Sequence, residues 1–308
     1  MDTPTTTAPV PKPRARKQRD ISRPLDALTP SQAQVLVCLA RYRYMTARQL
    51  VACGVASRVA TVRQEVLPRL CRLAGDNLVQ VQKELPFAVG NGRFSYVYAL
   101  TARGAEVVAD MPRAEPGPVR YPIGGIQYAN DFQHREAYVD FCIALDAWIA
   151  AGEARHCRIL THYFDKTGAN RRGQPSRSVN RLELPKAPGV IVPDGLALID
   201  TETKRRALVI EIHHKTDTKR IAEQLIAHMH ALAAGVVERH LGHDKSPFVL
   251  SVATTREAAA LVKKRMATVS GIERFAPVFL FNDLQTIMRD GFAAGWTHYD
   301  GRPAGVFG

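Results

Sequence analysis

The fold is decided by two neighbouring stretches of the sequence, Val190-Ile-Val-Pro-Asp194 and Ala207-Leu-Val-Ile-Glu-Ile-His-His-Lys215. The first reads as the entry to a strand with a carboxylate at its mouth. The second is an apolar run whose last residues turn polar, which is typical of a buried strand. A hairpin through residues 200–206 brings the two stretches side by side. They therefore predict adjacent strands with a polar cluster at one end.

Alternation along the second strand sorts its side chains between two faces. Because residues i and i+2 of a strand share a face, Glu211, His213 and Lys215 are expected to project together. Asp194, brought alongside by the hairpin, completes a cluster of two carboxylates and two basic groups. Such a cluster suits a divalent cation and a phosphate.

The composition favours a DNA-binding protein with two folded domains. A chain of 308 residues, 46% of them hydrophobic, is long enough to bury two cores. The net charge of +13 suggests a polyanionic partner, most simply nucleic acid, although an acidic membrane surface attracts a basic chain too. The 5 cysteines form no CxxC pair, which argues against a zinc ribbon or a disulfide framework. No signal peptide or membrane span is recognisable, so a cytoplasmic protein is expected.

Shifts in composition along the chain predict four segments. Proline, threonine and basic residues dominate the start of the chain, and prolines and glycines cluster again after residue 112. The predicted segments are a disordered basic tail (1–24), a DNA-binding domain (25–112), a linker (113–127) and an α/β domain (128–308).

Capping residues and periodicity place the elements of the first domain. Thr29, Thr46, Ser57 and Thr101 are the expected N-caps, and Pro68 is expected to kink or interrupt the third helix. The expected helices span about 30–42, 47–52, 58–73 and 102–111, and the expected strands about 78–84 and 93–100. This order of helices followed by a two-stranded ribbon is that of the winged helix-turn-helix.

In a winged helix the third helix enters the major groove of DNA and the ribbon lies along the backbone. The candidate DNA contacts on the third helix and the ribbon are therefore Arg58, Thr61, Arg63, Gln64, Lys83 and Arg93. Two alternatives stay open at this point: these arginines are ordinary solvated helix residues, or the winged helix contacts another protein.

The second domain reads as a helix, three strands, a helix, a strand, a helix, a strand and a last helix. The expected elements are helices near 129–151, 218–234, 256–266 and 284–289 and strands near 156–164, 195–199, 207–213, 248–253 and 277–281. A hairpin feeding a crossover helix and a further strand gives a mixed sheet covered by helices. This restriction-endonuclease-like α/β sandwich has the core order of the PD-(D/E)xK nuclease-like superfamily, whose acidic residues lie on the second and third strands. The whole chain is thus expected to be an α/β multidomain protein.

Metal-dependent phosphodiester cleavage needs carboxylates for Mg²⁺ or Mn²⁺ and a cation near the developing charge. Asp194 and Glu211 are the expected metal ligands, and Glu136 on the first helix is a candidate third carboxylate. His213 stands where the superfamily has its lysine, and Lys215 on the same face is a candidate substitute. Taken singly, Asp194 also fits a turn residue and His213 a polar strand end.

A second histidine pattern, His228-Met-His230, resembles the metal-binding motif of rolling-circle nickases. Those histidines lie on a strand, where they share a face. The segment 221–232 instead has helical periodicity, which places His228 and His230 about 200° apart. They are not expected to share a metal.

The chain resembles the replication-relaxation family, related to MobC-type plasmid mobilisation proteins. The residues that carry the resemblance are Leu28-Thr-Pro-Ser-Gln-Ala-Gln-Val-Leu36, Tyr44-Met-Thr-Ala-Arg-Gln-Leu50, Tyr98-Ala-Leu-Thr-Ala-Arg-Gly-Ala105, His134, Pro193-Asp194 and Val209-Ile-Glu-Ile-His213.

The resemblance implies binding to plasmid or transfer-origin DNA and a role in DNA relaxation, replication or mobilisation. In one reading this role includes nicking of the DNA by metal-dependent phosphodiester cleavage. A non-catalytic relaxosome accessory or a transcriptional regulator is the alternative. A partner-binding module that associates with other relaxosome proteins is a third.

Overall fold

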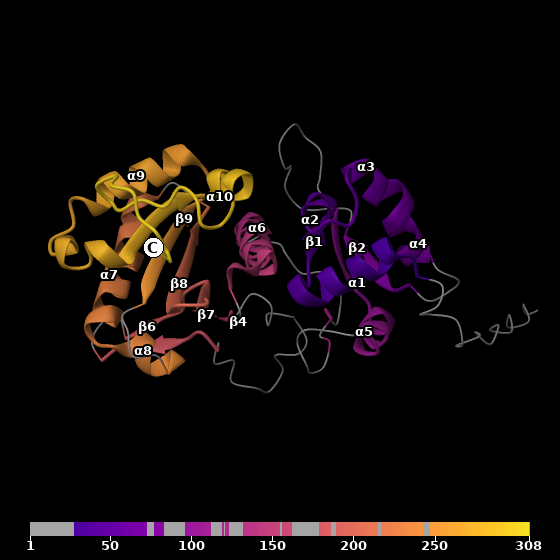
Figure 1. The fold of residues 1–308 in the computed structure, drawn as a ribbon, viewed down its shortest axis with the longest axis horizontal. Helices are drawn as coiled ribbons and strands as arrows, with labels where there is room; N and C mark the ends of the chain where they lie inside the picture. Colours follow the sequence, from indigo (N-terminus) through magenta and orange to yellow (C-terminus); the bar gives the residue numbers. More distant parts are fainter. Residues whose placement is uncertain are drawn as a thin grey trace, which may run out of the picture.

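The computed structural model describes residues 28–72, 77–82, 96–111, 119, 121–122, 132–154, 156–161, 179–185, 189–214, 217–242 and 247–307. The predicted basic tail and most of the predicted linker lie outside these residues, as do Lys83, Arg93 and Lys215. The architecture is mixed α/β, as expected. A helical N-terminal unit (residues 28–111) lies beside an α/β unit (residues 132–307), and helix α6 (Phe132–Trp148) of the α/β unit lies between the sheet of that unit and the N-terminal unit (Figure 1).

The first two helices of the N-terminal unit begin where their capping residues predict. Helix α1 (Pro30–Tyr42) and helix α2 (Ala47–Ala52) each start with a capping box. In these boxes the hydroxyl of Thr29 or Thr46 accepts a hydrogen bond from the backbone amide of Gln32 or Gln49, the third residue of the helix. The side-chain oxygen of the same glutamine accepts one from the backbone amide of the threonine.

The third helix differs from the expectation in its start and its middle. It runs through α3 (Val59–Thr61), a π-helical turn η1 (Val62–Val66) and α4 (Leu67–Arg72). Its N-cap is Arg58, with no side-chain cap, rather than Ser57. Pro68 does not interrupt it, because the π turn precedes the proline and the Leu67 amide bonds to the Val62 carbonyl. The widened turn relieves the clash that a proline ring makes with an α-helical carbonyl.

A three-stranded antiparallel sheet completes the N-terminal unit. Its order is β1 (Met45–Thr46), β3 (Val97–Leu100) and β2 (Val79–Gln82). The ribbon of β2 and β3 lies within the strands predicted from the sequence, and β1 adds a third strand to it. Helix α5 (Ala102–Ala109) follows. Its Gly104 is required by close approach, since a Cβ there would lie 2.1 Å from the Leu78 carbonyl oxygen.

The α/β unit is built on a five-stranded mixed sheet of order β10-β9-β8-β7-β4. Strands β4, β7 and β8 are antiparallel neighbours, whereas β8, β9 and β10 run parallel. The strands are β4 (His156–Leu160), β7 (Gly195–Asp200), β8 (Arg205–His213), β9 (Phe248–Ala253) and β10 (Phe279–Asp283), and the helices are α6 (Phe132–Trp148), α7 (Thr218–Ala233), α8 (Val236–Leu241), α9 (Arg256–Met266) and α10 (Leu284–Asp290).

The stretch at Val190 forms a separate small ribbon rather than the direct entry to a sheet strand. Strand β6 (Val190–Ile191) pairs with β5 (Leu182–Glu183). The chain then turns at Pro193-Asp194 before β7 begins at Gly195. Asp194 therefore stands at the mouth of β7, where the sequence placed it.

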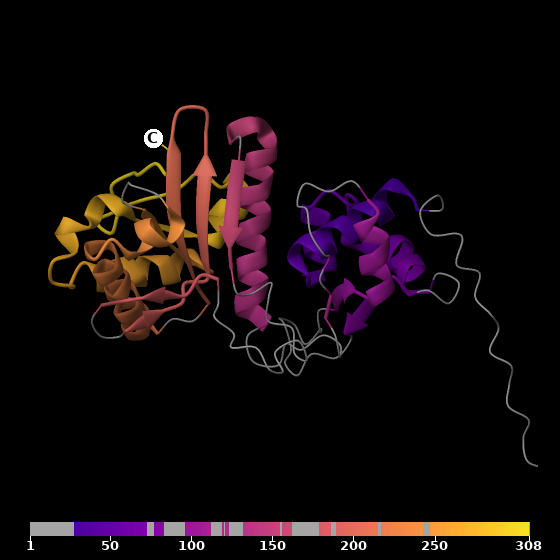
Figure 2. The same ribbon diagram turned by 90° about the horizontal axis from the view of Figure 1, so that it is seen from below.

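Helix α6 lies along one face of the sheet and other helices lie along the opposite face (Figure 2). Two apolar layers form between the helices and the sheet, as the alternation in β8 predicts. Leu208, Ile210 and Ile212 face the layer that contains α6 and α10. Ala207 and Val209 face the layer that contains α7 and α9. Burial of such side chains contributes about 1.5–3 kcal/mol each, so the layers fix the phase of β8 and of every polar residue at its end. Among the helices of the described ranges, none combines the length and the apolar run that crossing a bilayer needs.

Candidate functional site

The candidate site lies where β8 ends beside the mouth of β7 and the first turn of α6. Antiparallel pairing matches Gly195 with Ile210, so Asp194 is carried to the neighbourhood of Glu211. Gly195 is needed directly after Asp194, because a Cβ there would lie 2.5 Å from the Tyr138 hydroxyl of α6. Both predicted acidic residues are buried, Asp194 to 5% and Glu211 to 1% exposure.

Asp194 is held by the backbone of β8 and by α6. Its Oδ2 accepts a hydrogen bond from the Ile212 amide at 2.7 Å. The same oxygen lies 3.2 Å from the His134 Nε2, which also lies 2.7 Å from the Ile212 carbonyl oxygen. The Thr161 hydroxyl donates to the backbone carbonyl of Asp194 at 2.7 Å. Asp194 thus joins α6 to β8.

The pKa of His134 is raised by this arrangement. Burial alone disfavours the imidazolium, but the hydrogen bond and the negative charge of Asp194 outweigh it, with a further contribution from the Ile212 carbonyl. A charged His134 paired with Asp194 is the state that the contacts favour.

Glu211 is enclosed by helix α7. Its Oε1 lies 2.5 Å from the His228 Nε2, and its Oε2 accepts from the Gln224 amide at 2.5 Å. Burial and the neighbouring charge of Asp194 raise the pKa of Glu211 well above its ordinary value. Burial lowers the pKa of His228 to about 4, and among the described residues its Nδ1 has no hydrogen-bond partner.

His213 lies on the same side of β8 as Glu211, as expected from the alternation. Its Nε2 lies 2.9 Å from the hydroxyl of Ser251 on β9, and 4% of its surface is exposed. Burial lowers its pKa to about 4, so it is a neutral imidazole near neutral pH. His213 does not supply the positive charge of a lysine at this position.

Glu136 is not brought to this cluster. It lies two residues from His134, about 200° around the helix axis. Its Oε1 is 3.2 Å from Arg48 Nη2 of the N-terminal unit. The sequence placed it on the correct helix but on the wrong side of that helix.

Three polar residues of the cluster were not singled out from the sequence as site residues: Gln224, Ser251 and, in this role, His228. Helical periodicity correctly separates His228 from the exposed His230. The missed signal is that Gln224 and His228 lie four residues apart beside the apolar stripe of α7. Buried polar side chains need hydrogen-bond partners, and Glu211 on β8 is the polar residue that α7 packs against.

The donor set as arranged does not fit a divalent cation. Protein donors hold both oxygens of Glu211 and Oδ2 of Asp194. Within the described part of the chain, no three His, Cys, Asp or Glu side chains surround a position that could hold a metal ion. The requirement for Mg²⁺ or Mn²⁺ therefore stays a prediction from the sequence.

The predicted DNA contacts on the third helix lie at the surface. Arg58, Arg63 and Gln64 are exposed and Thr61 is half-buried. The guanidinium of Arg63 lies over the ring of Tyr96, 5.5 Å from its centroid, which orients it beside β3.

Comparison with known families places the chain. A family model described as Replication-relaxation matches residues 36–242. These residues include the third helix, α6, α7 and the Asp194 cluster, by which we mean Asp194 and Glu211 with His134, His213, Gln224 and His228. The chain belongs to the replication-relaxation family. No curated protein and no solved structure matches it.

Proposed function

We propose that this protein binds double-stranded DNA of a plasmid or other mobile element and acts in its replication, relaxation or mobilisation. Membership of the replication-relaxation family supports this role. So does the net charge of +13, which favours a polyanionic partner. The N-terminal unit is proposed to act as a winged helix and the α/β unit to be a PD-(D/E)xK-like domain related to those of MobC-type proteins.

The observation that carries the proposal is the third helix with its exposed polar side. Helices α2 and α3–α4 are joined by a short turn, and the β2–β3 ribbon follows in the chain. In helix-turn-helix proteins the second helix of such a pair enters the major groove. Arg58, Arg63 and Gln64 are side chains of the kinds that contact phosphates and base edges there.

Binding is tested by fluorescence anisotropy with plasmid fragments over a range of salt concentrations. Arg58→Ala and Arg63→Ala are each expected to weaken binding by about 1–3 kcal/mol. The slope of the logarithm of the binding constant against the logarithm of the salt concentration should become smaller by about one for each lost phosphate contact. Arg103→Ala on α5 is the control, because Arg103 pairs locally with Glu106 at 2.9 Å. Equal affinities for all three variants would exclude the third helix as the DNA-binding element.

Metal-dependent nicking is a second candidate function. It is favoured by one observation, the placement of Asp194 and Glu211 beside each other at the ends of β7 and β8. This placement is the one that the PD-(D/E)xK order requires. Asp194, Glu211, His213 and Lys215 are the candidate catalytic residues.

Supercoiled plasmid incubated with Mg²⁺ or Mn²⁺ tests the nicking candidate. Asp194→Ala and Glu211→Ala are expected to abolish the open-circular product. A product that persists in both variants would rule this site out. If the wild type binds the plasmid and yields no product with either metal, the role is that of a DNA-binding accessory or regulator. A weak salt slope together with tight binding to a second protein would instead indicate a partner-binding relaxosome module.

A further inference from the structure

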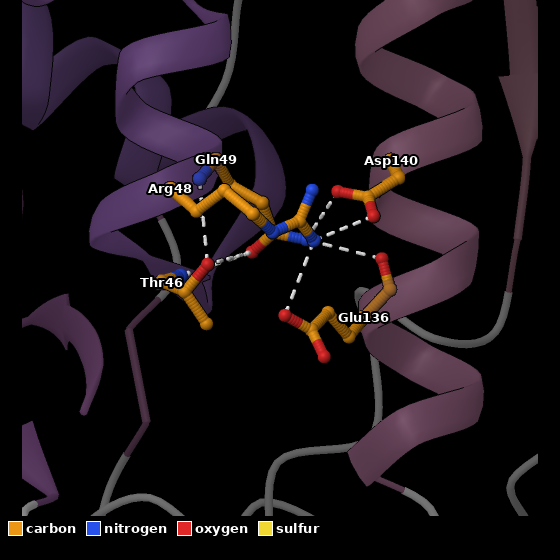
Figure 3. Close-up of polar contacts among 5 residues, drawn as sticks. All are labelled: Thr46, Arg48, Gln49, Glu136 and Asp140. Carbon is orange, nitrogen blue, oxygen red and sulfur yellow. Dashed lines mark hydrogen bonds and ion pairs between the residues drawn. The ribbon is translucent and has the colours of Figure 1, made fainter. Parts of the chain in front are cut away.

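Helix α6 has a second polar side, which faces the N-terminal unit rather than the sheet. Three carboxylates lie on it, those of Glu136, Asp140 and Asp146, and we call this side the α6 docking surface. Figure 3 shows Glu136 and Asp140 opposite Arg48 and Gln49 of α2. Each carboxylate of the docking surface has a partner from the N-terminal unit.

Arg48 provides the charge contact. Its Nη2 lies 2.6 Å from Asp140 Oδ2 and 3.2 Å from Glu136 Oε1. The side chain of Asp140 is 8% exposed, whereas that of Arg48 is 50% exposed. A buried carboxylate of this kind needs its cation, because an unpaired charge is costly to bury.

Gln49 ties the cap of α2 directly to α6. Its Oε1 accepts from the Thr46 backbone amide at 2.9 Å, which completes the capping box. Its Nε2 donates to Asp140 Oδ1 at 2.9 Å and to the Glu136 carbonyl oxygen at 3.0 Å. Gln49 is 1% exposed, so one buried amide both starts α2 and holds α6.

The contact continues along α6 and into the core. Asp146 takes two hydrogen bonds from the Arg41 guanidinium, at 3.1 and 3.2 Å, and one from the Tyr42 hydroxyl at 2.5 Å. Met45 and Leu50 of the N-terminal unit belong to the same apolar cluster as Val139 and Ile143 of α6. Polar and apolar contacts together span more than two turns of α6.

We infer that the α6 docking surface holds the N-terminal unit on the α/β unit as one cooperative body, and that α6 transmits DNA binding to the Asp194 cluster. The second half of this inference rests on the proposed function.

The two sides of one helix provide the physical route. Glu136 and His134 lie on opposite sides of the first turns of α6, and His134 contacts Asp194 and the Ile212 carbonyl. A helix transmits a displacement of one side to the other because its backbone hydrogen bonds keep it rigid. A ligand that stabilises one of two docked units stabilises both by the same linkage.

Arg48→Glu in the full-length protein tests the docking. The substitution places a third carboxylate against Glu136 and Asp140, while a negative charge at the second position of α2 suits the helix dipole. The N-terminal unit should therefore still fold. Arg103→Glu is the matched control, because Thr101-Ala102-Arg103 repeats the cap and first positions of Thr46-Ala47-Arg48. Among the described residues, the guanidinium of Arg103 pairs with Glu106 of its own helix and not with α6.

Scanning calorimetry separates the outcomes. The wild type and Arg103→Glu are expected to unfold in one transition and Arg48→Glu in two. Arg48→Lys, whose single ammonium can reach both carboxylates as Nη2 does, is expected to keep one transition. Two transitions in the wild type, or one in Arg48→Glu, would overturn the docking inference.

Added plasmid DNA tests the transmission. Bound DNA should raise the midpoint temperature of the single transition of the wild type. In Arg48→Glu it should raise only the midpoint temperature at which the N-terminal unit unfolds. A DNA-induced shift of both transitions in Arg48→Glu would overturn transmission through α6. If DNA shifts neither protein, the proposed DNA binding and the transmission fail together, while the number of transitions still decides the docking.

Discussion

Two carboxylate pairs lie near α6 and differ in what neutralises them. Asp194 and Glu211 face a backbone amide, imidazoles and a side-chain amide. Glu136 and Asp140 face the guanidinium of Arg48. Both pairs are largely buried, and burial raises the pKa of Glu136, Asp140 and Glu211 alike. The partner rather than the burial distinguishes them.

The difference bears on what each pair can do. A guanidinium stays charged at every physiological pH, so the Glu136–Asp140 pair is suited to permanent attachment. The imidazole of His134, whose pKa is raised, loses its proton as the pH rises, so the contacts of Asp194 depend on pH. His228 beside Glu211 is already neutral near pH 7. Permanent attachment and pH-dependent contacts are thereby separated onto two sides of one helix.

Among single substitutions compared at one pH, the largest effect is expected at Glu211. Glu211→Ala leaves a cavity and removes the hydrogen-bond acceptor of Gln224 and His228. Together these losses should lower the free energy of unfolding by about 3 kcal/mol. Glu211→Gln keeps the volume and should cost less. Urea denaturation at pH 7 measures both variants. An alanine variant as stable as the glutamine variant would show that the contacts with α7 contribute little.

The stability of the fold should also depend on pH through two buried imidazoles. His213 and His228 have a pKa of about 4 in the folded protein and about 6.5 when unfolded. The unfolded chain binds more protons between these values, so their contribution to stability rises with pH from about 4 to 6.5, by roughly 1.4 kcal/mol per pH unit for each imidazole.

Replacing one of these imidazoles measures its contribution to the pH dependence of stability. His213→Gln keeps a donor for Ser251 and should flatten the slope of stability against pH by about one proton in that window. Urea denaturation at intervals from pH 4 to 7 measures this slope. Unchanged slopes would mean that His213 titrates normally in the folded protein.

The smallest effect is expected at Asp140, whose partner Arg48 is half-exposed. Asp140→Asn keeps the shape and an acceptor for Gln49 but loses the charge opposite Arg48, at a cost of about 1 kcal/mol. Because Arg48 is half-exposed, 1 M salt should reduce this difference, whereas the effect of Glu211→Ala should persist. Equal salt sensitivity at both sites would remove the distinction between the two pairs.

Local patterns were sufficient to predict much of this molecule. Threonine caps located α1, α2 and α5, and alternation in β8 placed Glu211 and His213 on one side. Those signals are carried by residues within one or two turns of each other, where backbone geometry alone decides the outcome.

The partners of the buried polar groups were beyond these patterns. Gln49 and Asp140 are 91 residues apart in the chain, and Gln224 and Glu211 belong to different elements. Which element Glu136 contacts depends on how the two units pack against α6. The sequence alone therefore fits a metal ligand and a docking contact equally well at this position. Short strands such as β1 likewise form only because β3 is beside them.

The π turn in the third helix has a further consequence for how that helix tolerates change. Its buried residues are Val62, Val66, Leu67 and Leu70, a spacing one residue wider than the i, i+3, i+4, i+7 pattern of a regular amphipathic helix. The additional residue falls among exposed positions 63–65. Deleting one of them would restore the regular pattern and leave the core in phase. The π turn thus adds one residue to the exposed side of the third helix and leaves its buried side chains in contact with the core.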